Sequence, residues 1–129
     1  MILGANEKVD KKRQTNGASP NFVHAMDASL LMKAVITATK QLEDCPILTV
    51  HDCFSVRSCH AEAFLHILRS EFANLYEQPV MANWLEEIMP EEATAVASDK
   101  VKEMLMTLKI PERGGLNVRL IEQSDHAFG

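Results

Sequence analysis

A histidine and an aspartate, His51 and Asp52, stand between two short runs of β-forming residues. The flanking runs, 47–50 and 53–56, are rich in the β-branched and aromatic side chains that suit a pleated, half-buried surface. Aspartate tolerates turns, so the pattern predicts a hairpin over 46–57 with an ionisable pair at its tip. A carboxylate held between two strands could provide one oxygen ligand to a metal ion, or it could simply form a polar turn.

A second pair of candidates, His24 and Asp27, stands three residues apart in a stretch whose apolar residues recur at spacings of three and four. The periodicity predicts a helix over 20–41, and Pro20 suits the first turn of such a helix. Residues three apart share a helix face. They are either part of a site or exposed polar residues near a helix start, where Asp27 also suits the helix dipole.

Cysteines and further histidines raise two other possibilities. His51, Cys53, Cys59 and His60 are potential ligands for a soft metal, but they lack the paired spacings of structural zinc sites. A cysteine hydrolase that used Cys53 or Cys59 would have no local signature beyond the residue types. The chain has three cysteines, Cys45, Cys53 and Cys59. Their spacing is not that of a disulfide framework, so they are predicted to be free thiols in a reducing compartment.

Composition narrows the class of protein. A chain of 129 residues with 47 % hydrophobic residues is long enough for one domain with a core. The 18 acidic residues outnumber the 13 basic ones, which argues against a free-standing nucleic-acid binder. No apolar run is long enough to span a bilayer, so no membrane partner is expected. The basic run 11–13 is either a solvated arm or a phosphate contact.

The elements that must position these residues follow from the same patterns. The chain 1–129 is predicted to form a single α+β domain, with a small antiparallel hairpin packed against several α-helices. We expect an arm over 1–19, a helix over 20–41, the hairpin over 46–57, and a mainly helical part with a C-terminal tail over 61–129.

Four short motifs stand out along the chain. They are Pro20–His24 followed by Asp27 and Leu30, His51–Phe54, Ile110–Gly114 followed by Leu116, and Ser124–Gly129. In this order and at this spacing they resemble the start of a helix, motif C of the palm, a Pro-rich turn and the terminal tail in the C-terminal region of bacteriophage-type single-subunit RNA polymerases. Two positions depart from the family pattern: Cys53 replaces a serine, and His126 stands where an aromatic residue is common.

The resemblance implies a role for particular residues. Asp52 matches one of two carboxylates that hold the catalytic Mg²⁺ ions, and His24 matches a histidine that helps to position the growing base pair. His51 would support the metal-binding aspartate, whereas Phe128 and Gly129, in the tail near the catalytic pocket, are weaker candidates. The partner carboxylate of motif A and the fingers helix that grips the nucleotide are not found in this sequence.

The resemblance therefore implies part of a polymerase palm, which would be inactive alone. The complete enzyme would act on a DNA template, an RNA product and nucleoside triphosphates, and the chain would need the missing N-terminal region as a partner. We also expect the isolated chain to form a homo-oligomer. Its expected location is the cytoplasm of a phage-infected or prophage-bearing bacterium rather than an organelle. The alternatives are a non-catalytic assembly module, a fragment of a family A DNA polymerase, and a Cys/His metal-binding protein.

Overall fold

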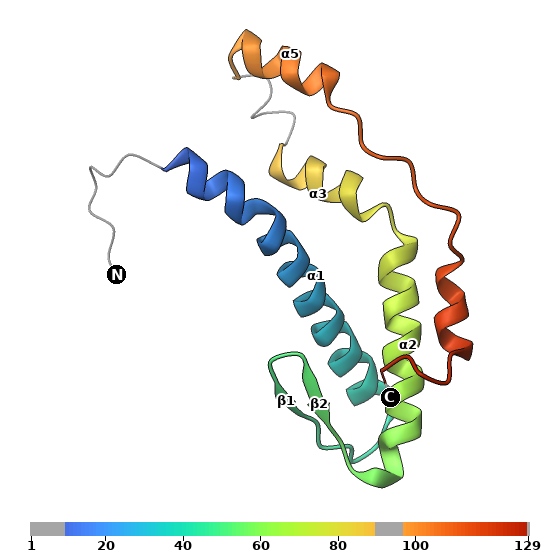
Figure 1. Ribbon diagram of the computed structural model, residues 1–129. Coiled ribbons are helices and arrows are strands. Elements are labelled where there is room, and N and C mark those ends of the chain that lie inside the picture. Colours follow the sequence, from blue (N-terminus) through green and yellow to red (C-terminus); the bar gives the residue numbers. More distant parts are fainter. Residues whose placement is uncertain (1–9, 90–96, 129) are drawn as a thin grey trace. The chain divides into compact units, whose positions relative to one another are not determined.

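The computed structural model describes residues 10–89 and 97–128 (Figure 1). The predicted α+β fold with a small antiparallel hairpin is confirmed. The described helices and strands are α1 (Lys11–Gln41), β1 (Leu48–Val50), β2 (Cys53–Ser55), the 3-10 helix η1 (Ser58–His60), α2 (Ala61–Glu77), α3 (Val80–Ile88), α5 (Asp99–Thr107) and the 3-10 helix η2 (Val118–Gln123).

The chain divides into two compact units, residues 1–68 and 69–129. Because α2 runs without a break across this boundary, the division does not by itself separate two domains. The single domain expected over 1–129 therefore stays a prediction.

Helix α1 begins at Lys11 rather than at residue 20, so part of the expected arm is helical. The reason is local: the Asp10 side chain accepts hydrogen bonds from the backbone N–H groups of Lys12 and Arg13, at 3.1 and 3.2 Å. An aspartate in this position satisfies N–H groups that lack a partner within the helix. Pro20 consequently lies inside α1 instead of in its first turn. The rest of the expected arm, 1–9, lies outside the described residues.

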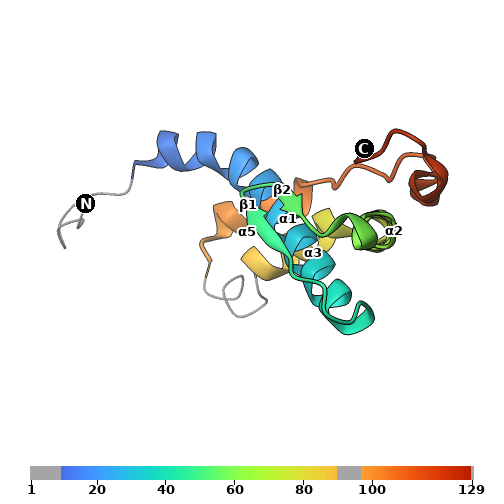
Figure 2. The same cartoon turned by 90° about the horizontal axis from the view of Figure 1, so that it is seen from below.

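The core of the first unit joins the hairpin to α1 and α2. Ala38, Phe64 and Ile67 are buried, and partly buried apolar side chains from the hairpin and its approach pack against them: Leu42, Ile47, Phe54 and Val56. The rings of Phe54 and Phe64 lie 5.1 Å apart at an angle of 56°, a tilted arrangement that aromatic pairs favour. In Figures 1 and 2 the hairpin accordingly lies beside α1.

An ion pair closes the base of the hairpin. Arg57 Nη1 donates to Asp44 Oδ2 at 2.9 Å and to the Asp44 carbonyl at 3.3 Å. Both side chains are more than half exposed, at 53 % for Arg57 and 87 % for Asp44, so the pair adds at most about 1 kcal/mol. Its contribution is to set the path of the chain into and out of the two strands.

In the second unit, arginines attach the C-terminal segment to α2. Arg113 donates to the carbonyls of Tyr76 and Glu77, at 2.8 and 2.7 Å, in the last turn of α2, where a helix cannot supply every carbonyl with its own N–H groups. The Arg119 guanidinium donates to both carboxylate oxygens of Glu77 at 2.7 Å and to Asn74 Oδ1 at 2.7 Å. Arg113 belongs to the predicted Pro-rich turn, whose role in this chain is therefore to cap α2.

The bond between Arg119 and Glu77 predicts how stability depends on pH. The hydrogen bond from Arg119 holds the pKa of the Glu77 carboxyl below its ordinary value of 4.5. A carboxyl whose pKa is lowered on folding stabilises the fold at pH values above its unfolded pKa, and this stabilisation disappears as the pH falls through the folded pKa. Urea denaturation of the wild type and of Glu77→Gln should therefore differ at neutral pH and converge in acid. Glu86 is an exposed carboxylate on α3. If Glu86→Gln differed from the wild type in unfolding free energy by the same amount at neutral pH, the Arg119–Glu77 bond would not be the cause.

Many large apolar side chains of the described residues are exposed. Among them are Leu48 at 65 %, Met106 at 88 % and Leu116 at 77 %. Exposed apolar surface favours association, so we expect the isolated chain to form oligomers whose mean mass rises with concentration in light scattering. A constant monomer mass across concentration would show this expectation to be wrong. No helix within the described ranges is long and apolar enough to cross a membrane.

Candidate active site

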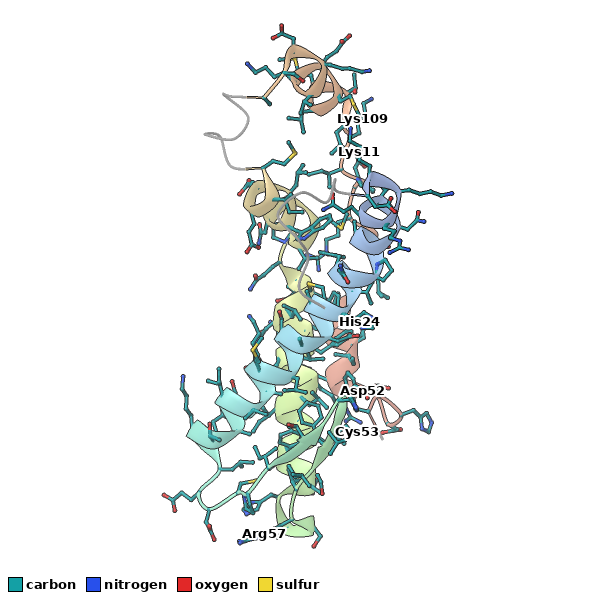
Figure 3. The ribbon with its side chains drawn as sticks, turned by 90° about the vertical axis from the view of Figure 1, so that its left-hand side faces the viewer. Lys11, His24, Asp52, Cys53, Arg57 and Lys109 are labelled. Carbon is teal, nitrogen blue, oxygen red and sulfur yellow. The ribbon has the colours of Figure 1, made fainter. Side chains whose placement is uncertain are left out.

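The middle of α1 and the tip of the hairpin line a pocket of about 500 Å³. Helix α1 contributes a histidine and an aspartate with an apolar floor, and the hairpin contributes its two tip residues. The lining residues are His24, Asp27, Ala28, Leu31, Met32, His51 and Asp52. Figure 3 shows His24 on α1 and Asp52 at the hairpin tip on the same side of the first unit, with Arg57 at the far end of the hairpin.

The register of the hairpin fixes the position of the ionisable pair. Val50 pairs with Cys53 in the antiparallel ladder, so His51 and Asp52 form the two-residue loop between the strands. His51 has a φ of 55°, in the left-handed region that glycine usually occupies at a hairpin turn. A non-glycine residue in this region costs about 1–3 kcal/mol and persists where neighbouring structure enforces it, often at functional sites.

This backbone geometry predicts effects of different size for two substitutions at the turn. His51→Gly removes the side-chain clash at positive φ but increases the freedom of the unfolded chain, so unfolding free energy should change by less than about 1 kcal/mol. His51→Val places a β-branched residue at this φ and should lower it by about 1–2 kcal/mol. Thermal unfolding followed by circular dichroism measures both. Equal stability of the glycine and valine variants would mean that φ at residue 51 is not constrained.

The structure brings together some of the predicted site residues and separates others. His24, His51 and Asp52 share the pocket, and so does Asp27, which the sequence places on one helix face with His24 and in the first family motif. Phe128 belongs to the second unit, where its ring packs against Phe72 at 5.6 Å. Gly129 lies outside the described residues. The assignment of these residues to a site stays a prediction.

The pocket contains some of the donor groups that the metal implied by the resemblance would need. Asp52 offers the carboxylate oxygen that Mg²⁺ prefers. Across 10–89 and 97–128, however, no group of three or more His, Cys, Asp or Glu side chains is placed to hold a metal ion. Cys53 and Cys59 are exposed free thiols, and they form no such group with His51 and His60. The described residues therefore form no complete site for Mg²⁺ or for a soft metal such as zinc.

Comparison with known proteins decides the family. The sequence model of the DNA-dependent RNA polymerase family matches residues 3–105. The chain belongs to this family. The match to the DNA-dependent RNA polymerase family includes both walls of the pocket, and it ends before the Pro-rich turn and the tail. No solved structure matches the chain.

Plant proteins are among the relatives of this DNA-dependent RNA polymerase chain. DNA-directed RNA polymerase 1, mitochondrial, from Arabidopsis thaliana is 29 % identical over 122 residues, which are 95 % of this chain and 11 % of the relative. DNA-directed RNA polymerase 2A from Nicotiana tabacum is 30 % identical, and the chain spans 33 % of its length. DNA-directed RNA polymerase 1A from the same plant is 29 % identical over 131 residues, and the chain spans 77 % of it.

These relatives correct one expectation about the polymerase chain. The sequence suggested a phage-infected or prophage-bearing bacterium, and that expectation is wrong. Matched relatives are plant proteins whose names place them in mitochondria or chloroplasts. The bacterial expectation rested on the tail, which lies outside the stretch 3–105 that the family model matches.

Proposed function

We propose that this chain is the C-terminal part of the palm of a DNA-directed RNA polymerase, in which Asp52 is one of two carboxylates that bind the catalytic Mg²⁺. The observation that carries the proposal is the shared pocket. Asp52 and His24 come from separate motifs on different elements, yet both line the same 500 Å³ space. Two motifs with a common function should converge in the folded chain, as these do.

Each wall of the pocket has a distinct task in this proposal. The hairpin tip holds Asp52 on a two-residue loop between two paired strands, so the backbone that carries its carboxylate is constrained. His24 on α1 presents an imidazole that donates to or accepts from the edge of the growing base pair. His51 holds the backbone of the turn. Phe128 and Gly129 are proposed to support the catalytic pocket from the tail.

The substrates follow from this assignment: a DNA template, the 3′ end of an RNA product and nucleoside triphosphates. Bound Mg²⁺ would supply charge stabilisation for in-line transfer of the nucleotide. A carboxylate such as Asp52 cannot hold that ion without further ligands, because Mg²⁺ requires near-octahedral oxygen coordination. The second carboxylate is therefore proposed to come from a preceding part of the polymerase, and the isolated chain should be inactive.

The test is extension of an RNA primer on a preassembled RNA–DNA scaffold, which removes any need for a promoter. The isolated chain, the preceding polymerase region, and the two together or joined would be compared. We expect RNA synthesis only when both parts are present. Extension of the primer by the isolated chain would contradict the proposal that the second metal-binding carboxylate comes from another part of the polymerase. A preference for deoxynucleotides over ribonucleotides would identify a DNA polymerase.

One observation favours a second candidate function, a non-catalytic assembly module. Many large apolar side chains of the described residues are exposed, which favours association with another protein surface. Such a module would bind a polymerase without contributing to its chemistry. In the scaffold assay its effect on RNA synthesis would then survive the loss of the Asp52 charge.

A further inference from the structure

A buried arginine in the second unit holds the end of the chain. Arg69, near the middle of α2, is only 8 % exposed, and its guanidinium donates from Nε and Nη2 to the Ala127 carbonyl at 3.1 and 3.0 Å. Removing a guanidinium from water is costly unless its N–H groups find acceptors. The bonds to Ala127, a residue 58 positions away in the sequence, are part of that compensation.

Phe128, the next residue of the tail, contacts α2 one turn further along the helix than Arg69. Phe128 packs edge-on against Phe72, with ring centroids 5.6 Å apart, and Phe72 in turn contacts Tyr76 at 4.5 Å. Arg69 and Phe72 are three positions apart on α2 and so lie on one face. Phe128 has a φ of 60°, which is unusual for an aromatic residue and indicates that its surroundings determine the backbone.

Little within the described tail itself would maintain this conformation. The 3-10 helix η2 ends at Gln123, and the one local side-chain bond described beyond it joins His126 N–H to Ser124 Oγ at 3.3 Å. A bond of that length at an exposed site is weak. The direction of the last described residues is therefore set by α2 rather than by the tail's own hydrogen bonds.

We propose that Arg69 is a positioning residue of the polymerase, which acts by holding Ala127 so that Phe128 has a single orientation. This inference rests on the proposed function, because it assigns Phe128 a supporting role in catalysis. Phe72 is the second half of the anchor and fixes the ring, whereas Arg69 fixes the backbone. The two contacts use different chemistry, so each can be removed without removing the other.

The first test uses the 129-residue chain and needs no catalytic activity. Release of C-terminal residues by a carboxypeptidase, followed by mass spectrometry, measures how often the tail leaves α2. Loss of bonds from a charged donor corresponds to roughly a tenfold to hundredfold increase in opening, so Arg69→Met should be digested faster by that factor. Arg69→Lys keeps the charge but loses the planar guanidinium that donates two hydrogen bonds, so its digestion rate should lie between those of the wild type and Arg69→Met. Arg113→Met, which removes the cap of α2 without touching the tail, is the matched control.

The second test is a double-mutant cycle in the complete polymerase, with KM for the nucleotide and kcat measured separately. Arg69→Met and Phe128→Ala should each lower kcat/KM, and Arg69→Met should have little further effect once Phe128→Ala is present. A residue that only stabilised the fold would instead add its full effect in both backgrounds. Additive losses, or digestion no faster than that of the Arg113→Met control, would overturn the inference.

The two failures can be told apart. If the complete wild-type protein makes no RNA on the scaffold, the proposed function is wrong, and the carboxypeptidase result still reports on the anchor. If the wild type is active while Arg69→Met matches it in both kcat and KM, only the positioning role is wrong. Phe72→Leu keeps an apolar side chain on α2, and it should show the same lack of additivity with Phe128→Ala if the anchor acts through the ring.

Discussion

Asp52→Asn in the complete polymerase is expected to reduce the rate of RNA synthesis by at least about a thousandfold, corresponding to about 4 kcal/mol of lost transition-state stabilisation. Asparagine has the same shape and tolerates the turn, so the hairpin should remain intact and only the charge is lost. The measurement is single-turnover primer extension at saturating nucleotide. Unchanged circular dichroism and melting temperature would show that the substitution acts on chemistry and not on folding.

The chain offers a matched control for that experiment. Asp44 is another exposed aspartate of the first unit, next to the same hairpin, and its carboxylate accepts a hydrogen bond from Arg57. Asp44→Asn makes the same chemical change outside the pocket and should alter the rate by less than about twofold, as is usual for surface substitutions. Near-normal synthesis by Asp52→Asn, or an equal loss for Asp44→Asn, would show that the motif C assignment is wrong.

Phe64→Ala is expected to lower the unfolding free energy by about 3–5 kcal/mol, the range for truncation of a buried phenylalanine. Phe64 is 5 % exposed and is the largest buried side chain of the small cluster that ties the hairpin to α1 and α2. Because a typical domain is stable by only 5–15 kcal/mol, this change should unfold much of the first unit. Urea denaturation followed by circular dichroism would measure it.

An exposed apolar residue of the same hairpin is the control for this loss. Leu48 is 65 % exposed on β1, so Leu48→Ala should change the unfolding free energy by less than about 0.5 kcal/mol. Phe54→Ala combined with Phe64→Ala should reveal a coupling of about 0.5–1.5 kcal/mol between the rings. If the two single losses simply add, the ring contact does not hold the hairpin in place.

The hairpin and its tip could be predicted from the sequence because both depend on neighbouring residues. The alternation around His51 and Asp52 sets the strands, and a two-residue loop follows from the register. The start of α1 was misplaced because Pro20 usually marks a first turn, whereas the cap at Asp10 allowed the helix to begin earlier. Asp10 and Pro20 are two competing signals for the start of one helix, and local sequence patterns do not show which of them prevails.

Contacts between distant residues could not be predicted from local patterns. Nothing near Arg113 or Arg119 indicates that their acceptors lie on α2, 36 to 45 positions earlier. The convergence of His24 with Asp52 was implied by a family resemblance, and the spacing of three placed Asp27 beside His24. The apolar lining of the pocket by Leu31 and Met32, however, required the fold. Pairings of this kind are determined by tertiary packing, which periodicity and residue type do not encode.

The early start of α1 has a consequence for how that helix behaves. Its first turns, from Lys11 to Pro20, contain no buried residue, and they include Gly17 and Pro20, which disfavour a helix interior by about 1 and 3 kcal/mol. An isolated helix of this length is marginal in water. This end of α1 should therefore exchange between coil and helix in the free chain. A neighbouring surface that binds this segment as a helix must offset the conformational entropy that the segment loses. The segment from Lys11 to Pro20 would then fold when it binds that surface.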